Sequence, residues 1–188
     1  GDVQAELDRV GEEIEEVGAH QRVAAGEDDV RLGGAERGEL VEDVHRLGRL
    51  MFANGVPYRF TFLCPWLDVM GTETDWLQGG EYRPPDDATL ALWRTMSGAK
   101  PYLLLMNTDY NAFGPDKVER YFARCLFYGF FPGFFSHNAA DNPYWQNPAW
   151  YNRDRPLFKK YLPLIKRVAE AGWRPWTTAR SGNEQVGP

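Results

Sequence analysis

The sequence predicts an α/β fold built on a parallel β-sheet. Its clearest strand is residues 102–106, a continuous apolar run within "KPYLLLMN", which is typical of a strand covered on both faces. Short apolar runs alternate along the chain with amphipathic helical segments, the βα rhythm of parallel sheets. Polar side chains follow the runs directly, and parallel folds place their working residues at the carboxyl ends of strands.

Composition divides the 188-residue chain, whose length suits one domain, into an acidic leader and an aromatic-rich body. Residues 1–48 carry 14 acidic and 5 basic side chains and none of the 27 aromatic residues. The net charge of −6 gives no electrostatic reason to expect nucleic acid or an anionic membrane surface as a partner.

The sequence shows no pattern typical of a membrane span, a signal peptide or a disulfide. No apolar run approaches the length of a membrane span, and the first residues lack the apolar segment of a signal peptide. Cys64 and Cys125 form no CxxC pair, so two buried thiols are expected in preference to a disulfide.

Two amphipathic helices are expected in the leader. In the first, apolar residues recur at spacings of three and four: Val3, Leu7, Val10, Ile14 and Val17. Residues 35–48 predict the second helix, which ends at Gly48. Its inward side chains are expected to be Leu40, Val44 and Leu47. We expect both helices to pack on the body and to contribute no site residue.

Strands and helices alternate through the body. Strands or buried extended segments are expected at residues 49–53, 58–63 with 67–70, 102–106 and 129–138. Gly114-Pro115-Asp116 opens a helix, whose inner face is Val118, Tyr121, Phe122, Cys125 and Leu126. Asp154 suits the N-cap of a last helix at residues 156–171, which ends at Gly172. Pro163 should kink this helix.

Polar residues follow each expected strand. They are Asn54 after the first, Glu73 and Asp75 after the second, Asn107 and Asp109 after the third, and His137 and Asn138 after the fourth. Because the carboxyl ends of parallel strands share one edge, Glu73, Asn107 and His137 should lie together around the main concave pocket. The acidic stretch "DVMGTETDW", residues 68–76, is placed where such a fold carries its site.

Five segments of the body resemble a known family. They are "LMFANGVPYRF", "DVMGTETDW", "KPYLLLMN", "YFARCLFYGFFPGFFSHN" and "NPAWYNRDRPLFKKYLPLIKRVAEAGWRP". Together they are similar to the late βα units of bacterial (β/α)₈-barrel glycoside hydrolases. The resemblance implies that residues 49–180 supply the last four strands of such a barrel, as a parallel half-barrel preceded by the two leader helices. Residues 181–188 would be an exit tail.

The resemblance also implies a carbohydrate substrate and no cofactor. Barrel glycosidases use two carboxylates on different strands, and in many families the fourth strand supplies one of them. A chain that matches the later strands lacks that partner. The chain is therefore expected to be a partial or inactive barrel, or to be completed by a complementary half-barrel or a second copy of itself.

Glu73 is the candidate general acid, and Asp75 and Asp109 are further catalytic candidates. The candidate sugar-binding residues are Asp68, Trp76, Asn107, His137, Asn138, Trp145 and Tyr151. Aromatic rings stack on the apolar faces of sugars, and amide, imidazole and carboxylate groups bind sugar hydroxyls. The aromatic residues within 141–156 could equally anchor a long loop to its own domain.

The polar candidates also have structural explanations. Glu73 could be a solvated loop residue or pair with an arginine, and Asp75 could cap a helix. Asp68 could be a structural carboxylate. Asn107 with Asp109 could form an Asx turn, and a lone histidine such as His137 often satisfies nearby backbone groups.

Other functional classes lack their motifs. The three histidines show no metal-ligand spacing, so no metal site is expected. Neither a GxGxxG nor a GxxxxGK loop is present, and no serine lies in GxSxG, which argues against nucleotide-binding and serine-hydrolase folds. A non-catalytic carbohydrate-binding or structural α/β module remains the alternative to a glycosidase.

Overall fold

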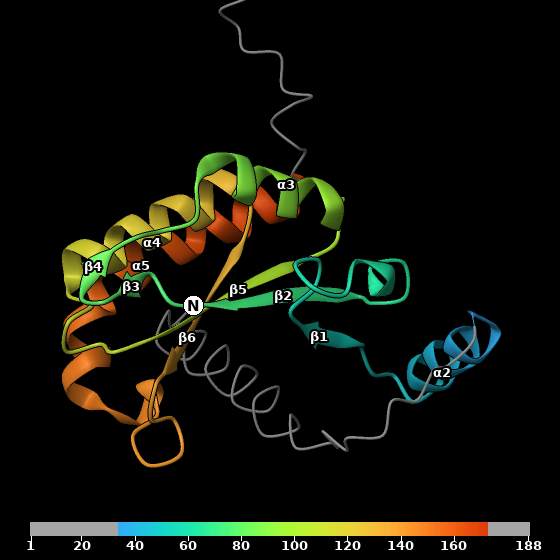
Figure 1. The fold of residues 1–188 in the computed structure, drawn as a ribbon, viewed down its shortest axis with the longest axis horizontal. Helices are drawn as coiled ribbons and strands as arrows, with labels where there is room; N and C mark the ends of the chain where they lie inside the picture. Colours follow the sequence, from blue (N-terminus) through green and yellow to red (C-terminus); the bar gives the residue numbers. More distant parts are fainter. Residues whose placement is uncertain (1–33, 173–188) are drawn as a thin grey trace, which may run out of the picture. The chain divides into compact units, whose positions relative to one another are not determined.

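The computed structural model describes residues 34–172 and confirms an α/β fold with a parallel sheet (Figure 1). Four strands form this sheet in the order β1-β2-β5-β6, and every pair is parallel. Their bounds are Phe52–Asn54 (β1), Val69–Thr74 (β2), Tyr102–Thr108 (β5) and Phe131–Ser136 (β6). The described residues form an open sheet and not a closed barrel.

Three helices lie together on one face of the sheet (Figure 1). They are α3 (Asp87–Ser97), α4 (Pro115–Tyr128) and α5 (Pro148–Glu170), which follow β2, β5 and β6 in turn. Between β2 and α3 the chain forms a small antiparallel hairpin of β3 (Leu77–Gln78) and β4 (Glu81–Tyr82). Neither α3 nor this hairpin was among the elements expected from the sequence.

The ends of these helices have local causes. The side chains of Asp86 and Asn147 accept hydrogen bonds from backbone N–H groups in the first turns of α3 and α5. Pro115 occupies the first turn of α4, where its missing N–H costs nothing. Gly129 ends α4 in the left-handed region, at φ +69°.

Alternation along β5 separates the two faces of the sheet. Leu104 and Met106 are fully buried, and Tyr102 stacks on Trp93 of α3 with ring centroids 6.4 Å apart. Leu103 and the other alternate side chains of β5 are half-buried on the opposite face. Parallel sheets usually have both faces covered, but helices of residues 34–172 cover one. We call the other the open face.

Two glycines let large neighbours lie flat on the open face. A Cβ at Gly71 would lie 2.5 Å from the ring of Phe52, and one at Gly133 would lie 2.5 Å from the Leu105 side chain. The glycines therefore leave room for a ring from β1 and a leucine from β5 to cover the neighbouring strands.

Tyr121 of α4 ties the helix layer to the sheet. Its hydroxyl accepts a hydrogen bond from the Gly133 N–H (3.0 Å) and contacts the carbonyl oxygens of Leu104 and Gly133. Complete burial raises the pKa of this hydroxyl well above its ordinary value, so it stays neutral. The contact joins β5, β6 and α4 through one side chain.

The second leader helix is confirmed as α2, Gly34–Arg46, followed by Gly48 at φ +68°. Its expected packing is wrong in part, because Leu40 and Leu47 are 44% and 77% exposed. The half-buried positions include Val41 and Val44, one turn apart. The first expected helix and the exit tail lie outside the described residues.

Two expected elements of the body need correction. Residues 58–63 do not form a strand but an exposed turn and the short 3-10 helix η1 (Thr61–Leu63). The last helix begins at Pro148 and not near 156, and it continues through Pro156 and Pro163. Asp154 therefore does not cap it. Asp154 is fully buried inside α5, where Arg153 pairs with it at 2.8 Å.

Both cysteines are free thiols, as expected. Cys125 is buried and Cys64 half-buried, and burial raises the pKa of both thiols. Among residues 34–172, no helix combines the length and apolar character that a membrane span requires.

Asp68 connects the amino ends of β1 and β2. Its Oδ2 accepts a hydrogen bond from the Met51 N–H (2.8 Å) and lies 2.8 Å from His45 Nε2 of α2. The Met51 N–H, followed by His45, lowers the pKa of Asp68 below its ordinary value. This carboxylate therefore holds the strand starts and α2 together.

We expect Asp68→Asn to lower the free energy of unfolding by about 1 kcal/mol at neutral pH, the usual net value of such a hydrogen bond. A carboxyl whose folded-state pKa is depressed stabilises the fold above its unfolded pKa and stops doing so as the pH falls through the folded pKa. The difference from wild type should therefore close below about pH 4.

Urea unfolding at neutral and acidic pH measures this difference. Asp141→Asn, at an exposed position, is the matched control. A gap between wild type and Asp68→Asn that stays constant across the acidic range would contradict the proposed role of the Asp68 charge.

Candidate functional site

A pocket of about 470 Å³ lies at the carboxyl ends of the parallel strands. Its volume falls within the range of small-molecule sites. All four parallel strands, or the residues directly after them, contribute to its lining, together with the loop that follows β1. The lining residues are Asn54, Gly55, Tyr58, Arg59, Phe60, Thr72, Glu73, Thr74, Asp75, Asn107 and His137.

Glu73 is held between two asparagines from the neighbouring strands. Asn54 Nδ2 of β1 donates to Glu73 Oε2 (2.9 Å), and Asn107 Nδ2 of β5 donates to Oε1 (2.5 Å). Parallel pairing causes this convergence, since β2 lies between β1 and β5 and all three end at the same edge. Both oxygens of the carboxylate are therefore fixed by amide donors.

The orientation of the Asn54 amide follows from its other contacts, and that of the Asn107 amide follows from Glu73 itself. Asn54 Oδ1 accepts hydrogen bonds from the backbone N–H groups of Glu73 (2.9 Å) and Gly55 (2.8 Å), so its nitrogen must face the carboxylate. Turning the Asn107 amide would set its oxygen against an oxygen of Glu73. Asn54 thus holds both the backbone and the side chain of Glu73.

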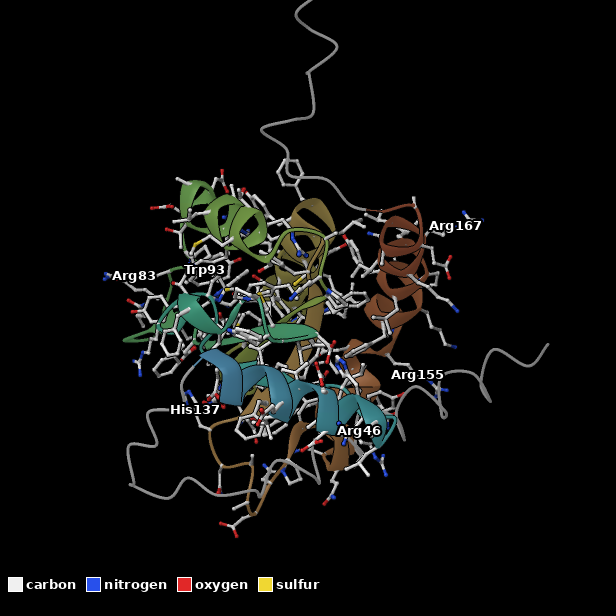
Figure 2. All side chains as sticks on the ribbon, turned by 90° about the vertical axis from the view of Figure 1, so that its right-hand side faces the viewer. Arg46, Arg83, Trp93, His137, Arg155 and Arg167 are labelled. Carbon is white, nitrogen blue, oxygen red and sulfur yellow. The ribbon has the colours of Figure 1, made fainter. Side chains whose placement is uncertain are left out.

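Asp75 and His137 form the second polar pair of the pocket. His137 Nε2 lies 3.0 Å from Asp75 Oδ2, and Asp75 Oδ1 accepts from the Leu77 N–H (2.8 Å). His137 follows β6, and its backbone N–H donates to the carbonyl oxygen of Thr108 at the end of β5 (3.3 Å). Figure 2 shows His137 on the opposite side of the sheet from Trp93 of the helix layer. The pair therefore spans the carboxyl edge from β2 to β6.

The loop after β1 supplies an aromatic wall. Tyr58 and Phe60 are 60% and 44% exposed, and each also makes an edge contact within the protein, Tyr58 with Trp93 (6.1 Å) and Phe60 with Phe62 (6.3 Å). Phe60 lies 3.7 Å from where a Cβ at Gly55 would be. Three backbone carbonyl oxygens farther along the loop, those of Cys64, Pro65 and Leu67, accept hydrogen bonds from Lys100 Nζ. Lys100 therefore attaches the loop to the start of β5.

The structure brings four of the sequence-predicted site residues into this pocket: Glu73, Asp75, Asn107 and His137. The predicted convergence is confirmed, because the three strand-end residues Glu73, Asn107 and His137 lie at one end of one parallel sheet and line the pocket there. Their chemical roles stay predictions.

The polar candidates Asp109, Asn138 and Asp68 lie outside the pocket lining. Asp109 Oδ1 accepts from the Asn111 N–H (2.9 Å), which is the Asx turn weighed above as the structural explanation. The carbonyl oxygen of Asn138 accepts from two backbone N–H groups of the following turn. Asp68 precedes β2 and lies at its opposite end.

The three aromatic candidates serve the core in this structure. Trp76 is fully buried, with its ring centroid 5.2 Å from that of Tyr121. Trp145 and Tyr151 are half-buried and contact each other and Phe158 of α5. None of the three lines the pocket. The alternative reading, an aromatic loop anchored to its own domain, describes Trp145 and Tyr151 better.

Seven lining residues were not among the candidates: Asn54, Gly55, Tyr58, Arg59, Phe60, Thr72 and Thr74. The sequence could have indicated Asn54, because it follows the first expected strand. Its neighbour Gly55 instead led to its interpretation as a turn residue. The three loop residues fell in a segment that was expected to be buried and extended. Aromatic Tyr58 and Phe60 alternate with polar Arg59 and Thr61, and this pattern does not distinguish a strand from an exposed loop.

Comparisons of the chain with protein-family models, curated proteins and solved structures found no match. Among residues 34–172, no cluster of three or more histidine, cysteine, aspartate or glutamate side chains could hold a metal ion.

We expect Asn54→Ala to lower the stability of the protein by about 1 kcal/mol or more, because three hydrogen bonds end on this side chain. Asn138→Ala is the matched control, since Asn138 also follows a strand but contributes its carbonyl group. Thermal unfolding measures both variants. Equal stability of the two would show that the Asn54 side chain does not hold the site.

Proposed function

We propose that this chain carries a carbohydrate site of the glycoside-hydrolase type, in which Glu73 is the principal carboxylate. The observation that carries the proposal is the fixing of Glu73 by Asn54 and Asn107 at the carboxyl ends of three adjacent parallel strands. Active sites of barrel enzymes are built at this end of the sheet.

The lining of the pocket supports carbohydrate as the ligand. Tyr58 and Phe60 offer exposed aromatic faces on one wall, and carboxylate, amide and imidazole groups lie on the strand ends. A pyranose ring presents an apolar face for stacking and hydroxyl groups that need both donors and acceptors. This pocket supplies both kinds of contact.

Strand order supports the barrel part of the proposal. Each parallel strand pairs with the next parallel strand along the chain, and α3, α4 and α5 lie on one face. A doubly wound sheet reverses its strand order and carries helices on both faces, whereas a (β/α)₈ barrel keeps sequential neighbours and has its helices outside. On this proposal the open face is the inner side of half a barrel wall.

The contacts of Glu73 change the role expected for it. A general acid carries a proton on one oxygen, but both oxygens of Glu73 accept from amide N–H groups. This arrangement suits a carboxylate that acts as a nucleophile, a base or a stabiliser of positive charge. We therefore propose this role for Glu73 in place of the acid.

Asp75 is the second carboxylate of the pocket, and hydrolysis requires a second group to donate a proton. Its two oxygens are engaged by His137 and by the Leu77 N–H. Neither carboxylate is arranged as a proton donor. This observation favours the second candidate function, binding of carbohydrate without hydrolysis, for the 188-residue chain on its own.

We expect the chain to bind simple sugars with dissociation constants in the millimolar range, because a shallow stacking contact supplies only a few kcal/mol. The probes are methyl glycosides of glucose, galactose, mannose and xylose, with maltose and cellobiose, followed by saturation-transfer NMR. Tyr58→Ala should weaken binding, while Phe127→Ala, at a 66% exposed aromatic outside the pocket lining, should not. Absence of binding to every sugar would overturn the proposal.

We expect slow or no hydrolysis of aryl glycosides by the chain, and loss of any measurable turnover in Glu73→Gln. Gln keeps the size of the side chain but removes its charge, and Glu81→Gln on the exposed hairpin is the matched control. Release of the aryl group and thermal unfolding are measured together. Turnover that persists in a folded Glu73→Gln variant would remove Glu73 from the mechanism.

A further inference from the structure

Arg59 is a cation of the pocket that no described carboxylate neutralises. It lies on the loop after β1, is exposed, and its guanidinium stands 5.7 Å from the centroid of the Tyr58 ring. Among residues 34–172 it forms no ion pair, although Glu73 and Asp75 line the same pocket. The guanidinium is therefore available to a ligand.

The negative and positive side chains of the pocket lie on different elements of the fold. The two carboxylates lie on β2 and directly after it, whereas Arg59 lies on the aromatic wall. His137 is already engaged by Asp75, and the oxygens of Glu73 are held by neutral amides. A ligand that matches this pattern carries one anionic group near the aromatic wall and its reacting or hydroxyl-bearing atoms near β2.

We infer that the pocket takes a hexuronic acid unit, with the carboxylate of the sugar paired to Arg59; this inference rests on the proposed carbohydrate function. In a hexuronate the carboxylate is attached at C5, across the ring oxygen from the anomeric carbon C1. One ring therefore carries an anionic group close to its anomeric carbon, which matches a pocket lined by both Arg59 and Glu73. Arginine suits this task because its planar fork binds a carboxylate through two parallel hydrogen bonds.

The neighbouring Tyr58 strengthens this assignment. An arginine that stands over an aromatic ring is partly preorganised, so it loses less side-chain freedom when it binds an anion. The exposed face of the same wall can contact the sugar ring. A neutral sugar would gain the stacking contact but leave the guanidinium without an ionic partner.

Matched pairs of sugars test the inference. The probes are the methyl glycosides of glucuronic acid and glucose, and of galacturonic acid and galactose, each as both anomers. Binding to the 188-residue chain is followed by saturation-transfer NMR at two salt concentrations. The variants are Arg59→Met, Arg59→Lys and, as control, Arg49→Met, an exposed arginine before the amino end of β1.

We expect at least one uronide to bind about tenfold more tightly than its neutral partner, the size expected for a hydrogen-bonded charge pair. Arg59→Met should abolish this preference, Arg59→Lys should keep part of it, and Arg49→Met should keep all of it. Added salt should reduce the preference.

The two proposals fail in different ways. If neutral and acidic sugars bind equally and Arg59→Met changes nothing, the uronate inference is overturned and the carbohydrate site stands. If none of the sugars binds, the carbohydrate function itself is overturned and the inference falls with it. A preference for uronides that persists in a folded Arg59→Met variant assigns the anion to another group and also overturns the inference.

Discussion

Parallel pairing of β2 with β1 on one side and β5 on the other is the interaction on which the site depends. Because the three strands run in the same direction, Asn54, Glu73 and Asn107 reach the same edge, and their side chains point to the same open face. A slip of β2 by one residue would turn the Glu73 side chain toward the helix layer and the Thr72 side chain toward the open face. Burial opposes such a slip, since Met70 is fully buried on the helix side. The hydrophobic pattern that fixes the core therefore also positions the carboxylate.

The two faces of the sheet are stabilised differently. On the helix side, large rings and the Tyr121 hydroxyl join α4 to β5 and β6. On the open face, Gly71 and Gly133 let Phe52 and Leu105 lie across their neighbours, so apolar side chains cover backbone that would otherwise meet solvent. This cover is incomplete, as Phe135 is 41% exposed. The open face is thus less buried than is usual for a parallel sheet, and an inner barrel wall would account for it.

The sequence was sufficient to predict the parallel sheet and the clustering of Glu73, Asn107 and His137, because both follow from local patterns: apolar runs of strand length with polar residues after them. It was not sufficient to separate aromatic residues of the core from those of the site. Tyr58 and Trp145 both lie in loops rich in aromatic residues, and which one is buried depends on helix α5, which begins earlier than Asp154 had indicated. Asp68 was misplaced for a simpler reason. It precedes its strand, and the residues that precede parallel strands lie at the edge opposite the site.

The partners of the carboxylates distinguish those that serve the fold from the one assigned to function. Asp154 is fully buried and is matched by Arg153 and by the Tyr144 hydroxyl, so its charge is neutralised where it lies. Asp68 is paired with His45. Glu73 differs, because neutral amides fix its oxygens and no described cation neutralises it. Its position is therefore fixed by neutral donors, and on the proposed function this arrangement would suit a group that stabilises an oxocarbenium-like transition state.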